Sequence, residues 1–470
     1  MIGLQPRVLL AAAASGSGKT TVTCAILRAL KNRGVRAAAF KCGPDYIDPM
    51  FHREVLGIPS TSLDLFLLQE QTVRSLLCEN AQEADIAILE GVMGYYDGIG
   101  MTDRTSSYHM ACVTKSPVIL LVDARGAALS LLAQIEGFLK YRPDSRIAGV
   151  IFNRLSPTQY PALKEHVEQD LGIASLGFLP KMSEAVLESR HLGLVTAEEV
   201  RGLQNKLDML ALQAEQNIEL DRLLALAKRA EPLSVGRQEI PVISKGLRIA
   251  VTRDKAFCFS YPDSIRLLQK MGAELCFFSP LQDEKLPEGC SGLLLCGGYP
   301  EVFAQELEAN FSMRAQVKQA VRNGLPCIAE CGGFLYLHAS IEDETAACRK
   351  MAGVLPIKGK RTDRLQRFGY AMLRAKEKNL LCNKGETIPV HEFHYWNSTD
   401  CGASFRARKA SNGSEWDCVF AGDTLYAGYP HLHFCSNPRM AVSFLQRCQR
   451  YKKEQIDDFR YSDSRDCPAG

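Results

Sequence analysis

A glycine-rich segment near the start of the chain places the tightest constraint on its fold. Residues 7–13 are a mostly apolar run typical of a buried strand, and residues 22–31 form a helical stretch. Between them, residues 15–21 read SGSGKTT, and such a loop between a strand and a helix offers backbone amides to phosphate. The strict pattern has glycine where this chain has Ala13. The complete strand, loop and helix context still favours phosphate binding over a polar turn.

Individual residues of this loop have distinct expected roles. Lys19 would reach the outer phosphates of ATP, and the Thr20 hydroxyl would bind the accompanying magnesium ion. Lys41 follows the next candidate strand, at 35–40. The predicted ATP-binding residues are Gly16, Gly18, Lys19, Thr20, Thr21 and Lys41.

Acidic residues follow two further candidate strands. Residues 41–49 read KCGPDYIDP after the strand at 35–40, and residues 90–98 read EGVMGYYDG after the strand at 85–89. In a parallel sheet the ligand crevice lies at the carboxyl ends of the strands, so these acids should share one edge with the loop. Carboxylates suit Mg²⁺, although Asp, Gly and Pro are also ordinary turn residues. The predicted magnesium ligands are Thr20, Asp45, Asp48 and Glu90.

A second chemistry is expected around Cys331. The sequence AECGGFL at 329–335 follows an apolar run and predicts a sharp strand-to-helix turn that exposes the thiol. The paired glycines allow the amide of Gly332 to face a developing oxyanion while the helix N-terminus lowers the thiol pKa. A second glycine turn, after the strand at 291–296, would supply the other amide, that of Gly298. The alternative is a buried cysteine beside a turn.

Two histidines near the C-terminal end are candidates for the general base. The segment LYAGYPHLHF at 425–434 contains His431 and His433 at the end of a short apolar run. If the run is a strand, both side chains point to one face and both can approach Cys331. The residues alone leave both His431 and His433 as candidates for the base.

Thiol, glycine turn and imidazole in this chain order resemble the triad-type glutamine amidotransferases, which release ammonia from glutamine through a thioester. Those enzymes hold a glutamate two residues after the histidine, where this chain has His433. The subgroup resembled is therefore the cobyric acid synthase and cobyrinate a,c-diamide synthase group, which lacks that glutamate. Segments 43–49 and 90–98 are similar to GPDYIDP and EGVMGLYDG segments of the latter, with Tyr95 in place of leucine. The resemblance extends from about Arg7 to about Gln449.

This resemblance implies an ATP-dependent ligase that amidates the a and c acetate carboxylates of cobyrinate in cobalamin biosynthesis, with L-glutamine as the amido donor. ATP would convert each carboxylate to an acyl phosphate, and ammonia would displace the phosphate away from competing water. Alignment with the His-Gly-x-Phe segment of cobyric acid synthases implies His431 as the base. Residues implied near the substrate or acyl phosphate are Tyr46, Asp48, Asp97, His391 and His394.

Other interpretations stay open at this point. The same chemistry could act on hydrogenobyrinate or nickel sirohydrochlorin, or on other carboxylates in the manner of cobyric acid synthase. A P-loop regulatory ATPase with a degenerate glutaminase domain is an alternative of another class. The presence of both Cys331 and His431 argues against it. In a strand at 389–395, His391 and Phe393 would share one face and His394 the other, and two satisfied half-buried histidines are as good an explanation as a substrate contact.

Composition narrows the class of protein. The 470 residues carry a net charge of only +3, without runs of Lys and Arg interleaved with aromatics, which argues against a nucleic-acid partner. The 17 cysteines are scattered without a CxxC pair, which favours reduced thiols over disulfides or structural zinc. No leader pattern or membrane-spanning run is apparent, so we expect a cytoplasmic protein that does not bind membranes. A homodimer is left open.

Strands and helices alternate along the chain, which predicts parallel sheets with helices on both faces. We expect a P-loop-like, dethiobiotin-synthetase-like amidoligase domain at 1–235, whose last part, 203–230, is helical. A linker at 236–246 leads to a class I glutamine amidotransferase-like α/β domain, expected to alternate throughout 247–450. The polar tail at 451–470 is expected to be disordered.

Overall fold

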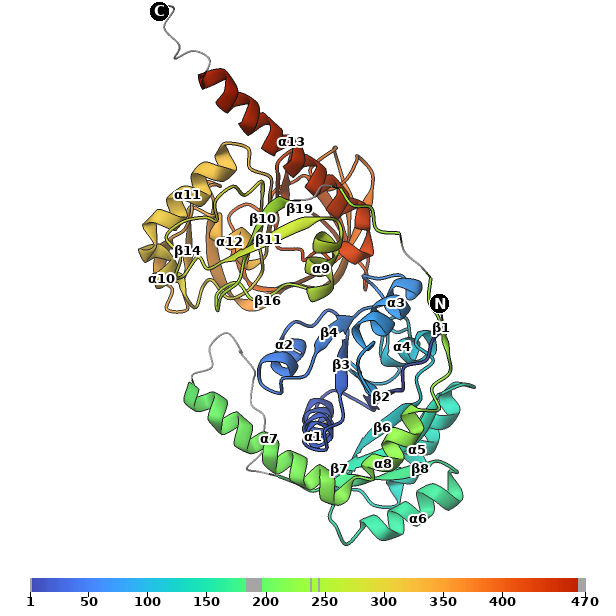
Figure 1. The fold of residues 1–470 in the computed structure, drawn as a ribbon. Helices are drawn as coiled ribbons and strands as arrows, with labels where there is room; N and C mark the ends of the chain where they lie inside the picture. Colours follow the sequence, from blue (N-terminus) through green and yellow to red (C-terminus); the bar gives the residue numbers. More distant parts are fainter. Residues whose placement is uncertain (1, 183–196, 237–238, 244–245, 464–470) are drawn as a thin grey trace, which may run out of the picture. The chain divides into compact units, whose positions relative to one another are not determined.

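The computed structural model describes residues 2–182, 197–236, 239–243 and 246–463, which belong to two compact units, Met1–Arg237 and Gln238–Gly470 (Figure 1). Each unit contains a mainly parallel sheet together with helices, so the predicted α/β fold class is confirmed. Among the described residues, no helix is both long enough and apolar enough to cross a bilayer.

A seven-stranded parallel sheet forms the centre of the N-terminal unit. Its strands in spatial order are β4 (Ser60–Leu63), β3 (Ala37–Cys42), β5 (Ile86–Glu90), β2 (Arg7–Ala12), β6 (Val118–Asp123), β7 (Ile147–Asn153) and β8 (Ala174–Leu179). The helices are α1 (Lys19–Asn32), α2 (Ile47–Glu54), α3 (Glu70–Asn80), α4 (Ser107–Val113), α5 (Ser130–Tyr141), α6 (Tyr160–Asp170), α7 (Ala197–Asn217) and α8 (Leu220–Ala227). Two short strands, β1 (Ile2–Gly3) and β9 (Leu233–Ser234), pair separately. The segments that follow β2, β3 and β5 therefore begin at one edge of the sheet.

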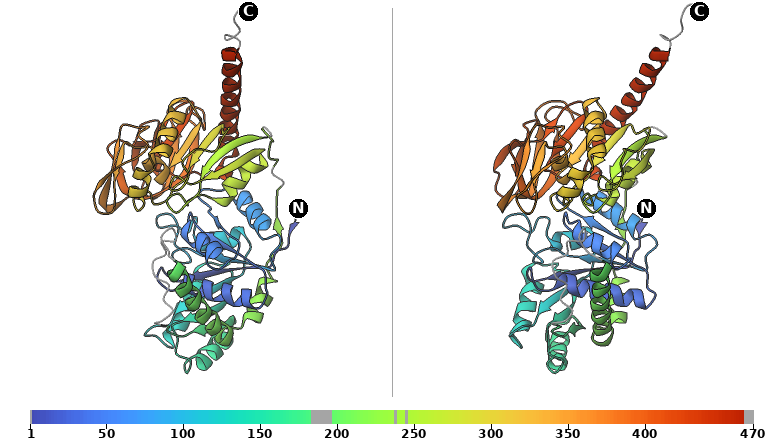
Figure 2. Two further views of the ribbon diagram at one scale, coloured as in Figure 1. Left: turned by 60° about the vertical axis from the view of Figure 1, so that its left-hand side comes forward. Right: turned by 90° about the vertical axis from the view of Figure 1, so that its left-hand side faces the viewer.

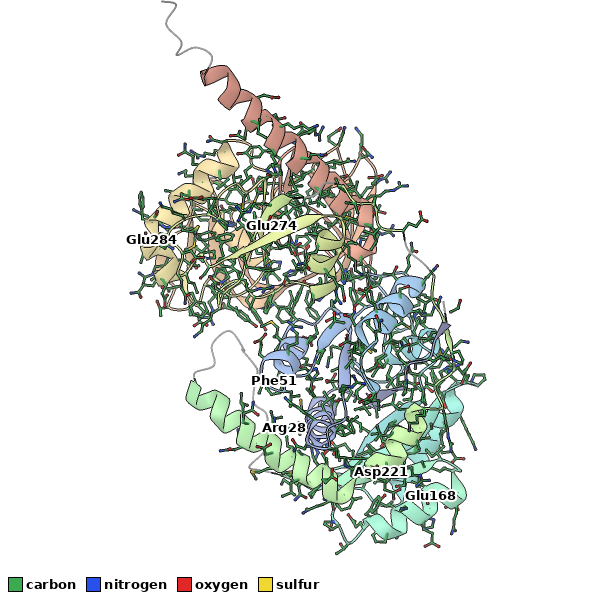
Figure 3. All side chains as sticks on the ribbon, in the orientation of Figure 1. Arg28, Phe51, Glu168, Asp221, Glu274 and Glu284 are labelled. Atoms are coloured by element: carbon green, nitrogen blue, oxygen red, sulfur yellow. The ribbon has the colours of Figure 1, made fainter. Side chains whose placement is uncertain are left out.

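Strand alternation decides which face of this sheet packs against α1, α7 and α8. Val8, Leu10 and Ala12 of β2 belong to one apolar core with residues of these helices, because every second side chain of a strand points the same way. Figure 1 shows α1 and α7 next to each other. Arg28 of α1, labelled in Figure 3, pairs with Asp208 of α7 at 2.7 Å.

The helical region predicted over 203–230 is interrupted. Its two parts, α7 and α8, are separated at Ile218, which pairs with Gly177 of β8 in an isolated antiparallel bridge. Gly177 permits this approach, because a Cβ atom there would lie 2.0 Å from the Asn217 carbonyl oxygen. A backbone pairing with the sheet thus overrides continuous helical propensity.

The C-terminal unit contains two sheets of different kinds. The first has strands β11 (Ala273–Phe278), β10 (Leu247–Thr252), β12 (Gly292–Leu295), β13 (Cys327–Glu330), β21 (Leu425–Gly428) and β20 (Phe420–Ala421), parallel except for β20. The second has β15 (Cys348–Lys350), β14 (Ser340–Glu342), β16 (Lys358–Ala375), β18 (Phe405–Lys409) and β19 (Glu415–Cys418), with β17 (Thr387–Ser398) also paired to β16. The helices are α9 (Pro262–Lys270), α10 (Ala304–Ala309), α11 (Phe311–Arg322), α12 (Gly332–Tyr336), the 3₁₀ helix η2 (Phe434–Ser436) and α13 (Pro438–Asp463).

The second sheet departs from the alternation predicted for the whole of 247–450. It is mainly antiparallel, and its long strands β16 and β17 pair with each other through two register shifts. An antiparallel sheet can keep one face in water, which accommodates the many charged residues of β16. A strand with one face in water gives a weaker signal in the sequence than a buried apolar run. This sheet was therefore not predicted.

The prediction that the tail at 451–470 is disordered is also wrong for most of that segment. Helix α13 starts with buried Met440, Phe444 and Cys448 and continues to Asp463, beyond the start of the segment 451–470. Its later residues include Lys, Glu and Gln, which favour helices, and Arg447 pairs with Glu454 at 3.1 Å. In Figure 2, α13 projects beyond the other elements of its unit.

Candidate active sites

The glycine-rich loop lies between β2 and α1, as the sequence predicts. Gly16 and Gly18 have φ of 79° and 88°, in the left-handed region that favours glycine. A Cβ atom on Gly18 would lie 2.2 Å from Nδ2 of Asn153, at the end of β7. This Asn153 amide donates to the Ser17 carbonyl at 2.9 Å, and Arg154 donates to the Gly16 carbonyl at 2.8 Å. The end of β7 therefore holds the loop in place.

Lys19, the first residue of α1, links the loop to the segment after β5. Its ammonium donates to the Met93 carbonyl and, at 3.4 Å, to the Ala14 carbonyl. Burial, together with the positive charge of Lys41, lowers the pKa of Lys19 to about 8. An ammonium placed among carbonyl oxygens beside a loop of backbone amides is suited to bind an anion.

Glu90 is the centre of a buried polar cluster at this edge of the sheet. Its Oε1 accepts hydrogen bonds from Thr20 Oγ1 at 2.6 Å and from Lys41 Nζ at 2.7 Å, and Lys41 also pairs with Asp48 at 2.7 Å. Burial lowers the pKa of Lys41, but the charges of Glu90 and Asp48 outweigh it and hold that pKa above its ordinary value. The predicted edge thus brings together Thr20, Lys41, Asp48 and Glu90.

Three other predicted residues occupy the neighbouring turns. Asp45 Oδ1 accepts from the backbone of Ile47 at 2.8 Å, at the start of α2, and burial with the charge of Asp48 raises the pKa of Asp45 to about 6. Tyr46 is the residue that precedes α2. Asp97 Oδ2 accepts from the Gly94 N–H at 3.0 Å, so it closes the turn after β5.

The oxygen donors of the cluster fit a hard divalent cation. Glu90 Oε2 is buried without a hydrogen-bond partner, and the Thr20 hydroxyl lies against the other carboxylate oxygen. Within the described residues, no group of three or more His, Cys, Asp and Glu side chains is arranged to hold a metal alone. Mg²⁺ commonly takes one or two protein carboxylates and completes its shell with phosphate and water, which such a donor set matches.

In the C-terminal unit, Cys331 occupies a strained turn between β13 and α12. Its φ is 46° and its ψ −100°, unusual for a residue other than glycine, and its N–H donates to the Gly428 carbonyl at 2.8 Å. The thiol is buried, and burial with the charge of Glu301 raises the pKa of Cys331 well above its ordinary value. The helix N-terminus was expected to lower the pKa of this thiol, but burial outweighs that effect. Helix α12 has only five residues and so offers a weak dipole.

The two predicted glycine turns approach each other closely. A Cβ atom on Gly332 would lie 2.8 Å from the Gly298 nitrogen, and one on Gly333 would lie 2.1 Å from the Leu295 carbonyl oxygen. A Cβ atom on Gly298 would in turn clash with the Ala256 carbonyl oxygen at 2.0 Å. Only glycine fits at these positions, and the backbones of Gly298 and Gly332 lie together beside Cys331.

His431 lies at the same edge of the sheet, beyond the end of β21. Its N–H donates to the His391 carbonyl at 2.9 Å, and its Nδ1 is 3.6 Å from Oε2 of Glu330. A Cβ atom on Gly297 would lie 2.6 Å from the His431 ring, so this imidazole covers the glycine turn. Burial and the nearby His394 lower the pKa of His431 to about 4, which keeps the ring neutral.

His433 has different surroundings. The strand β21 ends at Gly428, and His433 caps η2, with its Nδ1 accepting from the Cys435 N–H at 3.3 Å. Its ring stacks on Tyr261, with centroids 4.5 Å apart, and burial lowers its pKa to about 4. The run is therefore not a strand at the two histidines, and the condition under which they would share one face is not met, because the chain turns after β21.

The strand predicted at 389–395 is part of β17. Phe393 is half exposed, whereas Glu392 and His394 are buried. Oε2 of Glu392 lies 3.2 Å from Nε2 of His394. His394 also stacks on Tyr429, with centroids 3.7 Å apart. His391 is buried, and burial with the charge of His431 lowers its pKa to about 3. His394 therefore has packed and hydrogen-bonded partners, as a structural residue would, whereas Nδ1 of His391 is buried without a hydrogen-bond partner. A substrate contact through His391 stays a prediction.

Comparison with known proteins accounts for both units. A family model described as the CobQ/CobB/MinD/ParA nucleotide binding domain matches residues 8–194, and one described as the CobB/CobQ-like glutamine amidotransferase domain matches residues 248–439. Cobyrinate a,c-diamide synthase of Caldanaerobacter subterraneus is 40% identical over 95% of this chain and 99% of its own. The enzymes of Listeria innocua and Salmonella typhimurium are 40% and 38% identical over 93% and 94% of this chain, and 98% of their own. The chain belongs to the cobyrinate a,c-diamide synthase family.

As a member of the cobyrinate a,c-diamide synthase family, the chain is an enzyme, a glutamine-dependent amidoligase with a nucleotide-binding domain. Sequence reasoning missed three kinds of supporting residue in it. Asn153 and Arg154 steady the phosphate loop, Glu330 contacts His431, and Glu392 is buried beside His394. For the first pair, the one available signal was the apolar run IAGVIF at 147–152, typical of a buried strand, which ends directly before Asn153.

Proposed function

We propose that this chain amidates the a and c acetate carboxylates of cobyrinate, using ATP and glutamine and acyl phosphate intermediates, in cobalamin biosynthesis. The observation that carries the proposal is the union of two sites in one chain, a phosphate loop beside the Glu90 cluster and a cysteine elbow beside His431. Relatives that bear the name cobyrinate a,c-diamide synthase are 40% identical over 95% and 93% of this chain, and the two family models that match it span both sites.

In the glutaminase reaction, Sγ of Cys331 attacks the carboxamide carbon of glutamine. His431 takes the thiol proton and passes it to the departing nitrogen, which leaves as ammonia. The N–H groups of Gly298 and Gly332 stabilise the oxyanion. Water then hydrolyses the thioester to glutamate and restores the thiol. Because burial raises the pKa of Cys331, the thiolate has to form by this transfer and does not exist at rest.

In the synthetase reaction, a carboxylate oxygen of the macrocycle attacks the γ-phosphorus of ATP, and ADP leaves. The resulting acyl phosphate is attacked at carbon by ammonia, so that phosphate and a proton are released and an amide remains. Gly16, Gly18, Lys19 and Thr21 hold the phosphates through the loop and the start of α1. Thr20 and Glu90, with Asp48 and Asp45 nearby, would hold Mg²⁺, which neutralises phosphate charge. Tyr46 and Asp97 lie on the turns at this edge and are proposed substrate contacts.

The decisive experiment offers the full chain each candidate macrocycle. Cobyrinate, hydrogenobyrinate, nickel sirohydrochlorin and cobyrinate a,c-diamide are incubated with ATP, Mg²⁺ and glutamine, and the product masses are measured. We expect two amidations of cobyrinate and none of its a,c-diamide. Selective amidation of another macrocycle would change the substrate, and ATP hydrolysis without nitrogen incorporation would favour the regulatory ATPase.

Two further proposals concern the cellular location and the assembly state of the enzyme. We place it in the cytoplasm, since every cysteine that the structure describes is a free thiol. A homodimer stays the assembly to be tested. Cell fractionation tests the first proposal, and light scattering of the purified chain tests the second.

A further inference from the structure

His431 has a carboxylate neighbour that comes from an unexpected place in the chain. Triad-type amidotransferases orient the base with a glutamate two residues after it, and His433 holds that position here. His433 is turned toward Tyr261 and the backbone of Cys435. By contrast, Oε2 of Glu330 lies 3.6 Å from Nδ1 of His431.

The backbone fixes this neighbour firmly. Glu330 is the last residue of β13, directly before Cys331, and its backbone pairs with Gly428 at the end of β21. The N–H of Leu432, the residue after His431, faces the Glu330 carboxyl group. The Glu330 side chain is only 15% exposed and the His431 side chain 3%. The nucleophile and the carboxylate are therefore tied to one strand end, and the base to the next.

We propose that Glu330 is the positioning carboxylate of His431, in place of the glutamate that other triad amidotransferases hold after the histidine. The proposal rests on the proposed glutaminase roles of Cys331 and His431. The two atoms are 3.6 Å apart, just beyond hydrogen-bond distance, so a small movement brings the ionised carboxylate close enough to accept the Nδ1–H. The Nε2 lone pair is then left to take the thiol proton. It then stabilises the imidazolium that forms.

Protonation of Glu330 would reverse this arrangement. A protonated carboxyl group donates to Nδ1 and leaves the ring proton on Nε2, so that Nε2 has no lone pair for the thiol. Burial raises the pKa of Glu330 to about 8. Glutaminase activity should therefore rise as the pH increases through this region and Glu330 ionises. The other titratable groups around the pair are Cys296 after β12, Cys331, Tyr426 on β21, Tyr261 before α9, Glu301 after the glycine turn, and His391, Glu392 and His394 on β17.

Glu392 is the rival carboxylate and supplies a matched control. It is buried, and one of its oxygens has no hydrogen-bond partner. Its other oxygen already lies 3.2 Å from Nε2 of His394, whose ring is fixed by stacking on Tyr429. Burial lowers the pKa of His431 and the charge of Glu392 acts to raise it, but one Glu392 oxygen is already engaged by the His394 imidazole, which makes Glu392 the less suitable hydrogen-bond partner for His431.

The test compares Glu330→Gln with Glu392→Gln in the full chain. For Glu330→Gln we expect kcat of glutamine hydrolysis to fall on the order of 10²-fold or more with little change in KM, because the imidazolium loses its counter-charge. The rise of activity near pH 8 should also disappear. Glu330→Asp, which keeps the charge, should restore part of the activity and the pH dependence. Synthesis with free ammonia reports whether each variant is folded.

Two results would overturn the inference. One is a Glu330→Gln variant with glutaminase activity within about twofold of the parent and an unchanged pH profile, since a positioning group cannot be that dispensable. The other is a larger defect in Glu392→Gln, which would assign the role to Glu392. Absence of glutaminase activity in the unsubstituted chain is a separate outcome that would reject the proposed function itself and the inference with it.

Discussion

The two candidate sites hold their reactive groups in opposite ways. Around Glu90, charges are paired at rest: Lys41 contacts two carboxylates at 2.7 Å, and Thr20 donates to one of them. Around Cys331, burial raises the pKa of the thiol and lowers that of His431, so both groups are neutral at rest. A site that binds phosphates needs permanent charge, whereas a site that makes a thiolate needs charge only during the reaction.

The backbones of the two sites are also shaped in different ways. The phosphate loop is shaped by positive φ at Gly16 and Gly18 and is steadied by polar side chains. The cysteine elbow is shaped by contacts so close that glycine alone fits at Gly332 and Gly333. Substitutions at the first site should therefore disturb charge balance, and substitutions at the second should disturb chemistry with little effect on charge.

The largest effect is expected from Cys331→Ser. Because only the glutaminase step needs a sulfur nucleophile, glutamine-dependent amidation should be abolished while synthesis with high free ammonia remains. Both rates are measured by product mass on the same preparation. Equal loss of the two activities in a folded variant would mean that Cys331 does not serve glutamine hydrolysis.

The next largest effect is expected from substitutions at the phosphate site. Lys19→Ala, Asp48→Ala and Glu90→Ala should suppress synthesis with ammonia as well as with glutamine, because acyl phosphate formation precedes either nitrogen source. Basal glutaminase should persist in all three.

Glu90→Ala should also lower stability, because the buried Lys41 loses one of its two carboxylates. Since Asp48 still pairs with Lys41, the cost should stay below the about 3–5 kcal/mol of a buried charge left uncompensated. Thermal unfolding measures this cost, and Glu90→Gln is the isosteric control. Normal ammonia-dependent synthesis in the three alanine variants would reject the phosphate-loop assignment.

A smaller contrast is expected between the two histidines. His431→Ala should reduce glutamine hydrolysis by about 10² to 10⁴, the usual contribution of a general base, and His433→Ala should reduce it less. Thioester formation in single-turnover experiments reports the step directly. If His433→Ala proves the more defective, the roles of the two residues are reversed.

The smallest effect is a pH dependence confined to the phosphate site. Burial lowers the pKa of Lys19 to about 8, so its ammonium is lost as the pH rises through that value. The affinity of the free protein for ATP should weaken about tenfold from pH 7 to pH 9, since one pH unit above the pKa leaves about a tenth of the group charged. Calorimetric titration measures it, and Lys19→Arg, which stays charged, should remove the dependence. An unchanged slope in that variant would assign the titration to another group.

Local signals were enough to predict the segments around Lys19 and Cys331. A strand, glycine-rich loop and helix lie in order around Lys19, and the elbow around Cys331 follows an apolar run, because strand period and turn chemistry are read over a few residues. The acids at 41–49 and 90–98 could be placed at one edge, since parallel strands end together. The family resemblance rested on these same segments.

Features that depend on residues far apart in the chain become visible only in the folded protein. Ile218 divides a helical stretch by pairing with Gly177, and the turn after β21 sends His433 away from the face that His431 occupies. The contact of Glu330 with His431 joins residues about a hundred positions apart, and no periodicity encodes it. Sequence pattern fixes which face of an element is apolar, but the pairing of two side chains depends on how strands and turns pack, which is settled only when the whole core closes.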